Sequence, residues 1–210
     1  MANELLPTLE PGLPVWVKPN AVDDNGHPSL EGGDAVAYVG RLDAYKGIDL
    51  VLGLARRLPN RQFLIVGRGD REEAVRAATQ QAANIEWTPR MNPDEVLALM
   101  ARARVLLVPS MWDEPFGRVA AEALSVGTPA LVMDRGGLGE IVRGLPHELT
   151  VESSAEQLWS DKIERLFNIS REETALLRQQ CRARYEGAYT PSANAEALIS
   201  IYRDALQRVG

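Results

Sequence analysis

The sequence has a single cysteine, two histidines and few aromatic residues. With only Cys181 present, no disulfide can form within the chain and a cysteine-based metal site is excluded. His27 and His147 do not have the spacing of a metal-binding pair. Aromatic residues make up 6% of the chain, which does not predict a stacking platform for single-stranded nucleic acid.

The chain also lacks an excess of positive charge and a long hydrophobic run. Lys and Arg number 23 against 29 Asp and Glu, a net charge of −6, so we expect no general binding of nucleic acid. No apolar stretch approaches the roughly 18–20 residues that span a bilayer. Residues 1–11 lack the basic and apolar regions of a signal peptide. We therefore expect a cytoplasmic protein.

The 210 residues that are present, 45% of them hydrophobic, suffice for one domain with a real core and a helical tail. Residues 1–33 are rich in proline and are typical of a linker, with a possible edge strand at 15–17. Residues 34–152 alternate between strand and helix patterns. Residues 153–210 have only helical patterns, so we expect three regions.

Within 34–152, short apolar runs predict buried strands and each run is followed by a helical pattern. Strands are expected at 35–39, 63–66, 85–87, 105–108, 130–132 and 149–151. Helices are expected at 46–58, 70–83, 92–103, 117–125, 138–143 and 154–167, with two more beginning near Ser170 and Pro191, and with Asp70, Asn92 and Ser170 as N-caps. This alternation predicts an α/β fold, a Rossmann-like doubly wound parallel sheet with a C-terminal helical tail.

Ligands of such sheets bind at the carboxyl ends of the strands, so the loops there are the candidate site. Gly40, Arg41 and Lys46 follow the first predicted strand and flank a helix start. The two cations and the helix N–H groups would suit a pyrophosphate. Spacing alone, however, favours the interpretation that both are surface charges.

A second glycine-rich loop, Gly67-Arg68-Gly69, follows the next strand and resembles the start of a dinucleotide fingerprint. The third glycine of that fingerprint is missing, because position 72 is Glu72. We interpret this loop as a tight turn with Asp70 as the N-cap of the next helix. The broken fingerprint disfavours a nicotinamide-dependent oxidoreductase.

Two carboxylates, Glu114 and Glu122, flank the start of the predicted helix 117–125. Glu122 has small apolar neighbours, and an unpaired charge there would be costly to bury. A vicinal diol such as a ribose offers two donors to one carboxylate, although a surface Glu is the alternative. Gly136 and Gly137 precede the next helix, either as a nest of N–H groups for phosphate or sugar oxygens or as an ordinary turn.

Taken in order, these motifs resemble the nucleotide-sugar domain of retaining GT-B glycosyltransferases, with family 4 (the group 1 transferases) as the nearest group. The motifs are Gly-Arg-Leu with Lys-Gly, Pro-Ser with Glu-Pro-Phe-Gly and Glu-Ala-Leu, Gly-Thr-Pro, and Gly-Gly with Glu. Each motif alone is unspecific, but each falls after its own predicted strand. The resemblance covers roughly residues 17–141.

The resemblance implies a function and a set of roles. It implies transfer of a hexosyl group from a UDP- or GDP-sugar to a hydroxyl acceptor, with retention and without a metal or cofactor; no Asp-x-Asp pair is present. Arg41 and Lys46 would hold the leaving diphosphate and Glu114 the sugar hydroxyls. The remaining donor-binding residues would be Gly40, Arg90, Phe116, Gly117, Arg118, Glu122, Gly136 and Gly137, with Glu122 at the ribose and Arg90 near the base.

The resemblance also implies a missing partner. The family has an N-terminal acceptor domain, and residues 17–23 resemble the segment between the two domains. We expect the chain to be inactive without an acceptor domain or partner chain, and membrane-peripheral, if at all, only within a full enzyme. The last helix, with Ile201, Tyr202 and Leu206, could drive self-association. The alternative is a non-catalytic nucleotide-binding or assembly module that acts through a partner chain.

Overall fold

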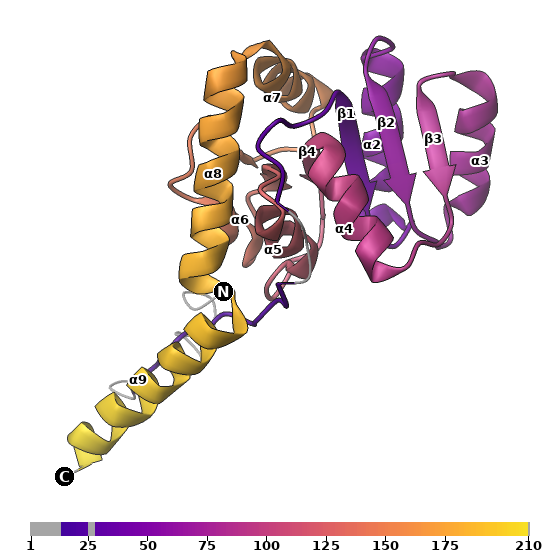
Figure 1. The fold of residues 1–210 in the computed structure, drawn as a ribbon. Coiled ribbons are helices and arrows are strands. Elements are labelled where there is room, and N and C mark those ends of the chain that lie inside the picture. The colour runs from indigo at the N-terminus through magenta and orange to yellow at the C-terminus, as the bar shows by residue number, and fades with distance from the viewer. Residues whose placement is uncertain (1–13, 25–27, 210) are drawn as a thin grey trace.

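The computed structural model describes residues 14–24 and 28–209 and contains one parallel sheet with helices on both faces (Figure 1). Its six strands lie in the order β3-β2-β1-β4-β5-β6. They are β1 (Ala35–Val39), β2 (Gln62–Val66), β3 (Ile85–Thr88), β4 (Ala103–Val108), β5 (Ala130–Met133) and β6 (Thr150–Val151). The predicted doubly wound fold is confirmed, and all six predicted strands are present.

The helices divide between the two faces of the sheet. The 3₁₀ helix η2 (Ala44–Lys46) precedes α2 (Ile48–Arg57), and the others are α3 (Glu72–Gln81), α4 (Pro93–Arg102), α5 (Arg118–Ser125), α6 (Leu138–Val142), α7 (Glu156–Asn168), α8 (Arg171–Ala188) and α9 (Pro191–Val209). Contacts join α2 to α7 on one face, and α4 and α8 to α5 on the other. Right-handed crossovers explain this division, because the chain moves outward from β1 to β3 and then returns past β1 to β4.

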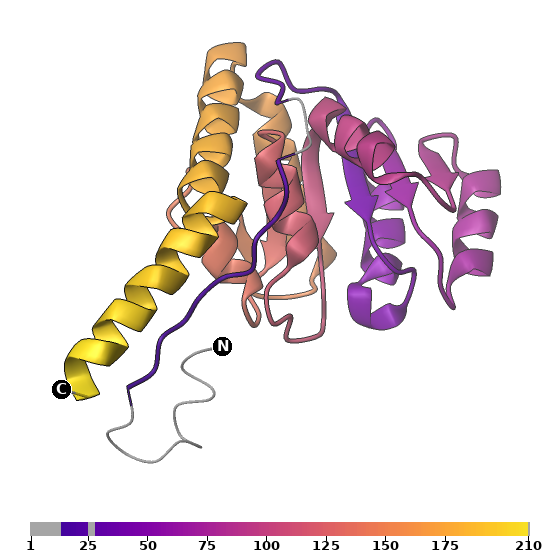
Figure 2. The ribbon, with the colours of Figure 1, turned by 60° about the horizontal axis from the view of Figure 1, so that its bottom comes forward.

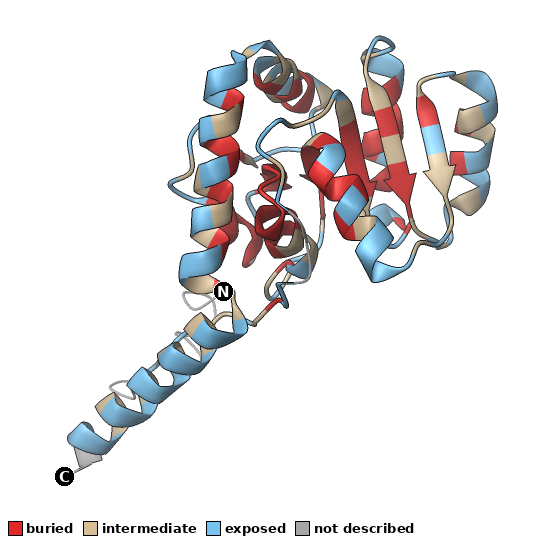
Figure 3. Cartoon of the chain, in the orientation of Figure 1, coloured by how far each residue is buried: buried red, intermediate tan, exposed pale blue. Residues whose placement is uncertain are grey.

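The core is continuous through the sheet and under its helices (Figure 3). The inner strands β1 and β4 are almost fully apolar because both of their faces are covered. Arg178 of α8 is fully buried and donates to the carbonyl oxygens of Ala101 and Ala103 at 2.7 and 2.9 Å and to Thr128 Oγ1 at 3.0 Å. Burial lowers the pKa of its guanidinium to about 10. This arginine joins α8 to the start of β4.

Two local predictions from the sequence are wrong. The structure has no strand at 15–17; this segment runs beside α9 (Figure 2), and Trp16 Nε1 donates to Asp204 at 2.7 Å. Pro14 and Pro19 lack the N–H groups that strand pairing needs, and the neighbour is a helix. Asp70 does not cap α3, whose N-cap is Arg71 without a side-chain bond. The predicted caps Asn92 and Ser170 are confirmed, each within a capping box.

Helix α9 extends away from the rest of the molecule (Figure 1). Its side chains Tyr202 and Leu206 are 63% and 75% exposed. Among the described residues, no helix is both long enough and apolar enough to cross a membrane.

Candidate active site

The loop after β1 is held in place by backbone contacts, which position Arg41 and Lys46. Tyr38 Oη donates to the carbonyl oxygen of Arg41 at 2.7 Å, and Asp43 accepts from the Lys46 N–H at 2.8 Å. Burial raises the pKa of the Tyr38 phenol, so this donor keeps its proton. Gly47 has a φ of +76°, and a Cβ there would lie 2.1 Å from the carbonyl oxygen of Pro109. The loop after β1 therefore lies directly against the loop after β4.

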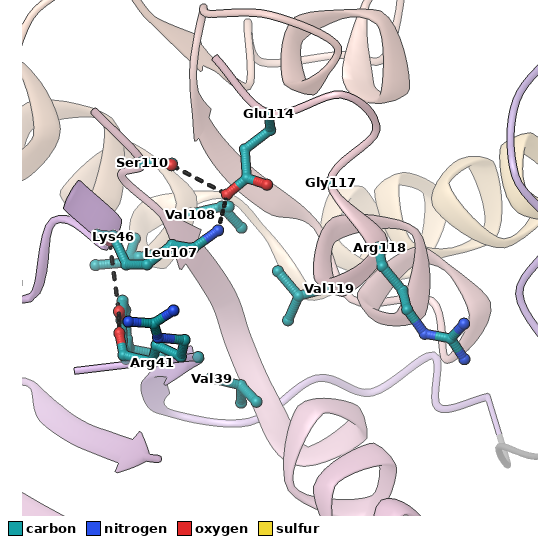
Figure 4. A pocket seen from close by; sticks show the side chains of 12 residues that line it. Val39, Arg41, Lys46, Leu107, Val108, Ser110, Glu114, Gly117, Arg118 and Val119 are labelled. Carbon is teal, nitrogen blue, oxygen red and sulfur yellow. Dashed lines mark hydrogen bonds and ion pairs between the residues drawn. The ribbon is translucent and has the colours of Figure 1, made fainter. Parts of the chain in front are cut away.

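Glu114 comes from that second loop and reaches Lys46. Lys46 Nζ donates to Glu114 Oε1, and Ser110 Oγ donates to the same oxygen at 3.0 Å (Figure 4). The Lys46 and Glu114 side chains are 33% and 16% exposed, so both remain open to a ligand. The sequence did not indicate Ser110 as a site residue, because its role depends on how the loop folds back.

A cavity of about 300 Å³ opens beside this ion pair, and all three predicted catalytic residues, Arg41, Lys46 and Glu114, line it. We call it the Lys46–Glu114 cavity. Arg41 lies at its rim, with a side chain that is 75% exposed and pairs with Asp43 at 3.2 Å. The other predicted site residues that line this cavity are Gly40, Gly117 and Arg118. The cavity thus combines three cations, Arg41, Lys46 and Arg118, and one carboxylate, Glu114, with the first turn of α5.

Glu122 lines a neighbouring cavity of about 300 Å³, together with Met91 and Val39. Arg118 lines both cavities, and its Nε lies 2.8 Å from Glu122 Oε1. Arg118, one helical turn earlier in α5, therefore provides the charged partner that Glu122 requires in its apolar surroundings. This pair was not predicted from the sequence, although the i to i+4 spacing of the two residues could have indicated it.

Arg90 lines a third, more open hollow of about 410 Å³ with Gly40, Arg41, Arg68 and Met91. It does not line the Lys46–Glu114 cavity. Val39, the last residue of β1, lines all three spaces. The three hollows are therefore contiguous around the carboxyl end of the central strand.

Three predicted residues lie elsewhere. Phe116 packs edge-on against Tyr189, with the ring centroids 5.7 Å apart, and with Gly137 lines a separate groove of about 620 Å³. A Cβ at Gly136 would lie 2.6 Å from the Glu114 carbonyl oxygen, and one at Gly137 would lie 2.7 Å from that of Pro115. The two glycines allow the close packing that supports the Glu114 loop, and their contact with a donor stays a prediction.

Within residues 14–24 and 28–209, no three or more His, Cys, Asp or Glu side chains are grouped so that they could hold a metal ion. The charged groups that line the two neighbouring cavities are Arg41, Lys46 and Arg118, with the carboxylates Glu114, Glu122 and Asp23. The arrangement can bind an anion beside Lys46 and Arg41 while it offers carboxylate oxygens to hydroxyl groups.

Comparisons with known proteins agree with this reading of the fold. Two solved structures share it: sucrose-phosphate synthase from Thermosynechococcus elongatus (TM-score 0.81, 22% identity, 99% of this chain and 56% of that one) and HepE from Anabaena in complex with UDP and glucose (TM-score 0.72, 19% identity, 87% and 55%). The fold is one half of the GT-B architecture.

Sequence comparison gives the family. D-inositol 3-phosphate glycosyltransferase of Mycobacterium tuberculosis H37Rv is 29% identical over 180 residues, which cover 81% of this chain and 37% of that protein. The chain thus matches little more than a third of the length of this curated relative. The model of the family described as "Glycosyl transferases group 1" matches residues 21–184. The chain belongs to the group 1 glycosyltransferases.

Proposed function

We propose that this chain is the donor-binding domain of a retaining glycosyltransferase of the family 4 type. It would bind a UDP- or GDP-sugar and, with an acceptor domain, transfer the hexosyl group to a hydroxyl. The observation that carries the proposal is the convergence of Arg41, Lys46 and Glu114 on one cavity, with Glu122 in the next. The structure of the Anabaena neighbour is a complex with UDP and glucose, which supports a uridine nucleotide as the first ligand to test.

Each side chain has a role that follows from its charge. Lys46 and Arg41 attract the diphosphate, and Glu122 accepts hydrogen bonds from the two ribose hydroxyls. Glu114, held by Ser110, is placed to accept from hydroxyls of the sugar. Gly40, Gly117 and the loop of Arg90 border the donor, and the two glycines at 136 and 137 fix the Glu114 loop.

The chemical step needs stabilisation of a leaving group. The bond between the anomeric carbon and the diphosphate oxygen breaks, and negative charge grows on the diphosphate next to Lys46 and Arg41. The acceptor oxygen bonds to the same face of the anomeric carbon, and its proton passes to the departing phosphate oxygen. The configuration is retained without a protein nucleophile. Fixed cations at such a position typically contribute on the order of 10²–10³ in rate each.

No metal or cofactor enters this scheme, because Arg41 and Lys46 supply the positive charge that the diphosphate requires. The acceptor site lies in a second domain or partner chain, for which segment 14–20 and α9 are the proposed contacts. The proposed cellular location is the cytoplasm.

The direct test is to titrate UDP and GDP into the chain and then to add an acceptor domain from a relative with the donor sugar. Saturable binding, followed by sugar transfer only in the mixture, supports the proposal. Nucleotide binding without transfer in any mixture would favour a non-catalytic nucleotide-binding module.

A further inference from the structure

The loop that carries Glu114 has no regular secondary structure. Residues 109–117, between β4 and α5, belong to no helix or strand. The backbone N–H and carbonyl groups of such a segment need individual partners. Two of these partners come from other loops: the Met111 N–H donates to the Tyr45 carbonyl, and the Gly137 N–H donates to the Glu114 carbonyl, both at 2.7 Å. The position of Glu114 therefore depends on the loops after β1 and β5.

A side chain from the loop after β5 holds the same segment. Arg135 Nη1 donates to the Met111 carbonyl, and Arg135 Nε lies 3.6 Å from Asp113 Oδ1. One guanidinium can serve both acceptors because its N–H groups form a planar fork. Met111 is thus held at its N–H by the loop of Lys46 and at its carbonyl by Arg135.

The backbone of Arg135 is itself fixed. Its N–H donates to the Met133 carbonyl at 2.8 Å, and its carbonyl accepts from the Leu138 N–H at 3.2 Å. The next residue, Gly136, packs against the backbone of Glu114. Arg135 lines neither the three hollows nor the separate groove described above. Any effect of this arginine on a ligand therefore passes through the loop that it holds.

We propose that Arg135 is a positioning residue that keeps Glu114 within reach of the donor sugar. The proposal rests on the proposed function, which assigns the sugar hydroxyls to Glu114 and the diphosphate to Lys46 and Arg41. Those two cations come from the loop after β1, which Tyr38 and Asp43 hold independently of Arg135. Arg135 therefore matters for binding of a sugar nucleotide and not for binding of the bare nucleotide.

The first test measures the hold on the loop without any ligand. Hydrogen exchange of the Met111 amide is followed by NMR in the wild type, in Arg135→Gln and in Arg143→Gln. Arg143 is the matched control, an exposed arginine that pairs at 3.5 Å with Asp134 of the same loop. Exchange should be about threefold to tenfold faster in Arg135→Gln, because opening of the loop no longer breaks a hydrogen bond and an ion pair. It should be unchanged in Arg143→Gln.

The second test asks whether Arg135 acts through Glu114. UDP and UDP-glucose are titrated calorimetrically into the same variants, and Arg135→Gln is also combined with Glu114→Gln. Arg135→Gln should weaken UDP-glucose by about threefold to tenfold without weakening UDP, while Arg143→Gln should alter neither ligand. In the Glu114→Gln background the loss on replacing Arg135 should disappear, because the carboxylate through which it acts is already absent.

Three results would overturn the proposal: equal Met111 exchange in Arg135→Gln and the wild type, weaker UDP binding by Arg135→Gln, or an equal loss of UDP-glucose affinity with and without the Glu114 carboxylate. The last two would mean that Arg135 acts on the nucleotide site or on the fold as a whole. Binding of neither ligand by the wild type would instead contradict the proposed function, and the exchange rates would still decide whether Arg135 holds the loop.

Discussion

Under the proposed function, we expect Glu114 to change partners when the donor enters the Lys46–Glu114 cavity. Without a ligand its carboxylate accepts from Lys46 and Ser110. A diphosphate would draw Lys46 away, and the carboxylate would then lie close to a second anion. Sugar hydroxyls would compensate by donating to it, so we expect Glu114 to disfavour a bare nucleotide and to favour a sugar nucleotide.

This exchange predicts opposite effects for one substitution. Glu114→Gln should bind UDP a few-fold more tightly than the wild type, because Lys46 is released and a repulsion is removed. It should bind the UDP-sugar more weakly, by about 1.5 kcal/mol or more, because hydrogen bonds to a charged group are lost. Calorimetry with both ligands measures the two effects.

Glu122→Gln is the matched control, since both ligands contain the ribose. It should weaken UDP and UDP-sugar to the same extent. A Glu114→Gln variant that loses affinity for both ligands equally would show that Glu114 does not distinguish the sugar.

The sequence indicated the charged side chains of the candidate site more readily than the residues that hold their loops in place. Arg41, Lys46 and Glu114 could be found because each follows a strand whose apolar run is easily recognised. Ser110 and Tyr38 were missed because their contacts join loops that are distant along the chain. For Gly136 and Gly137 the contact with a ligand stays a prediction, while their close packing against the backbone of the Glu114 loop was not predicted.

At the scale of elements, the site depends on how closely the loops pack. Gly136 has a φ of +55° and lies against the Glu114 backbone, while Gly144 has a φ of +85° with nothing within 4 Å of its missing Cβ. The positive φ at both positions strains any L-residue, but only a Cβ at Gly136 would also clash with neighbouring atoms. Comparing alanine substitutions at Gly136 and Gly144 therefore distinguishes the effect of backbone strain from the effect of loop packing.

We expect Gly144→Ala to cost about 1 kcal/mol of unfolding free energy, the usual cost of a left-handed alanine. Gly136→Ala should cost more and should also weaken UDP-sugar binding, because the Glu114 loop must move. Denaturant unfolding measures the free energy of unfolding, and calorimetry measures the affinity for the UDP-sugar. Equal stability and equal binding of the two variants would contradict a supporting role for Gly136.

A second prediction at this scale concerns the link between α8 and β4. Arg178→Met should lower the free energy of unfolding by about 3 kcal/mol, because buried acceptors lose their donors. Arg165→Met, at an exposed position of α7, should change it by less than about 0.5 kcal/mol. Urea unfolding compares them, and similar stabilities would mean that the buried guanidinium does not anchor α8.

Strands were predicted within a few residues because burial on both faces leaves an unbroken apolar run. The start of α3 was not predicted correctly, because hydrogen bonds to a loop that is distant along the chain determine where the helix begins. The Leu42 N–H donates to the Arg68 carbonyl at 2.8 Å, and the Arg71 N–H to the Leu42 carbonyl at 2.9 Å. These bonds hold the 67–71 loop in place, so that α3 begins at Glu72 and Asp70 stays in the turn.

At the scale of the whole molecule, α9 with segment 14–20 is an extension of the domain with little core of its own. Trp16 bonds to Asp204, and Lys18 Nζ donates to Asn194 at 2.7 Å. Segment 14–20 and α9, which are far apart along the chain, are thus joined side by side (Figure 2). Apolar side chains that remain exposed on this extension include Val17, Ile199, Tyr202 and Leu206.

We expect the isolated chain to self-associate through this face at high concentration. Leu206→Glu should shift the association to higher concentration, whereas Gln207→Glu, the same change of charge at the adjacent exposed residue, should have a smaller effect. Sedimentation equilibrium measures both. A wild-type chain that stays monomeric throughout the concentration series would argue against association through α9.

The proposed function requires that the loops after β1 and β4 form one nucleotide-sugar site. Calorimetric titration of UDP and GDP into the wild type, Arg41→Ala and Lys46→Ala examines this requirement. We expect saturable binding of at least one nucleotide and a loss of about 1.5–3 kcal/mol in each variant. No binding of either nucleotide up to millimolar concentration, or unchanged affinity in both variants, would contradict it.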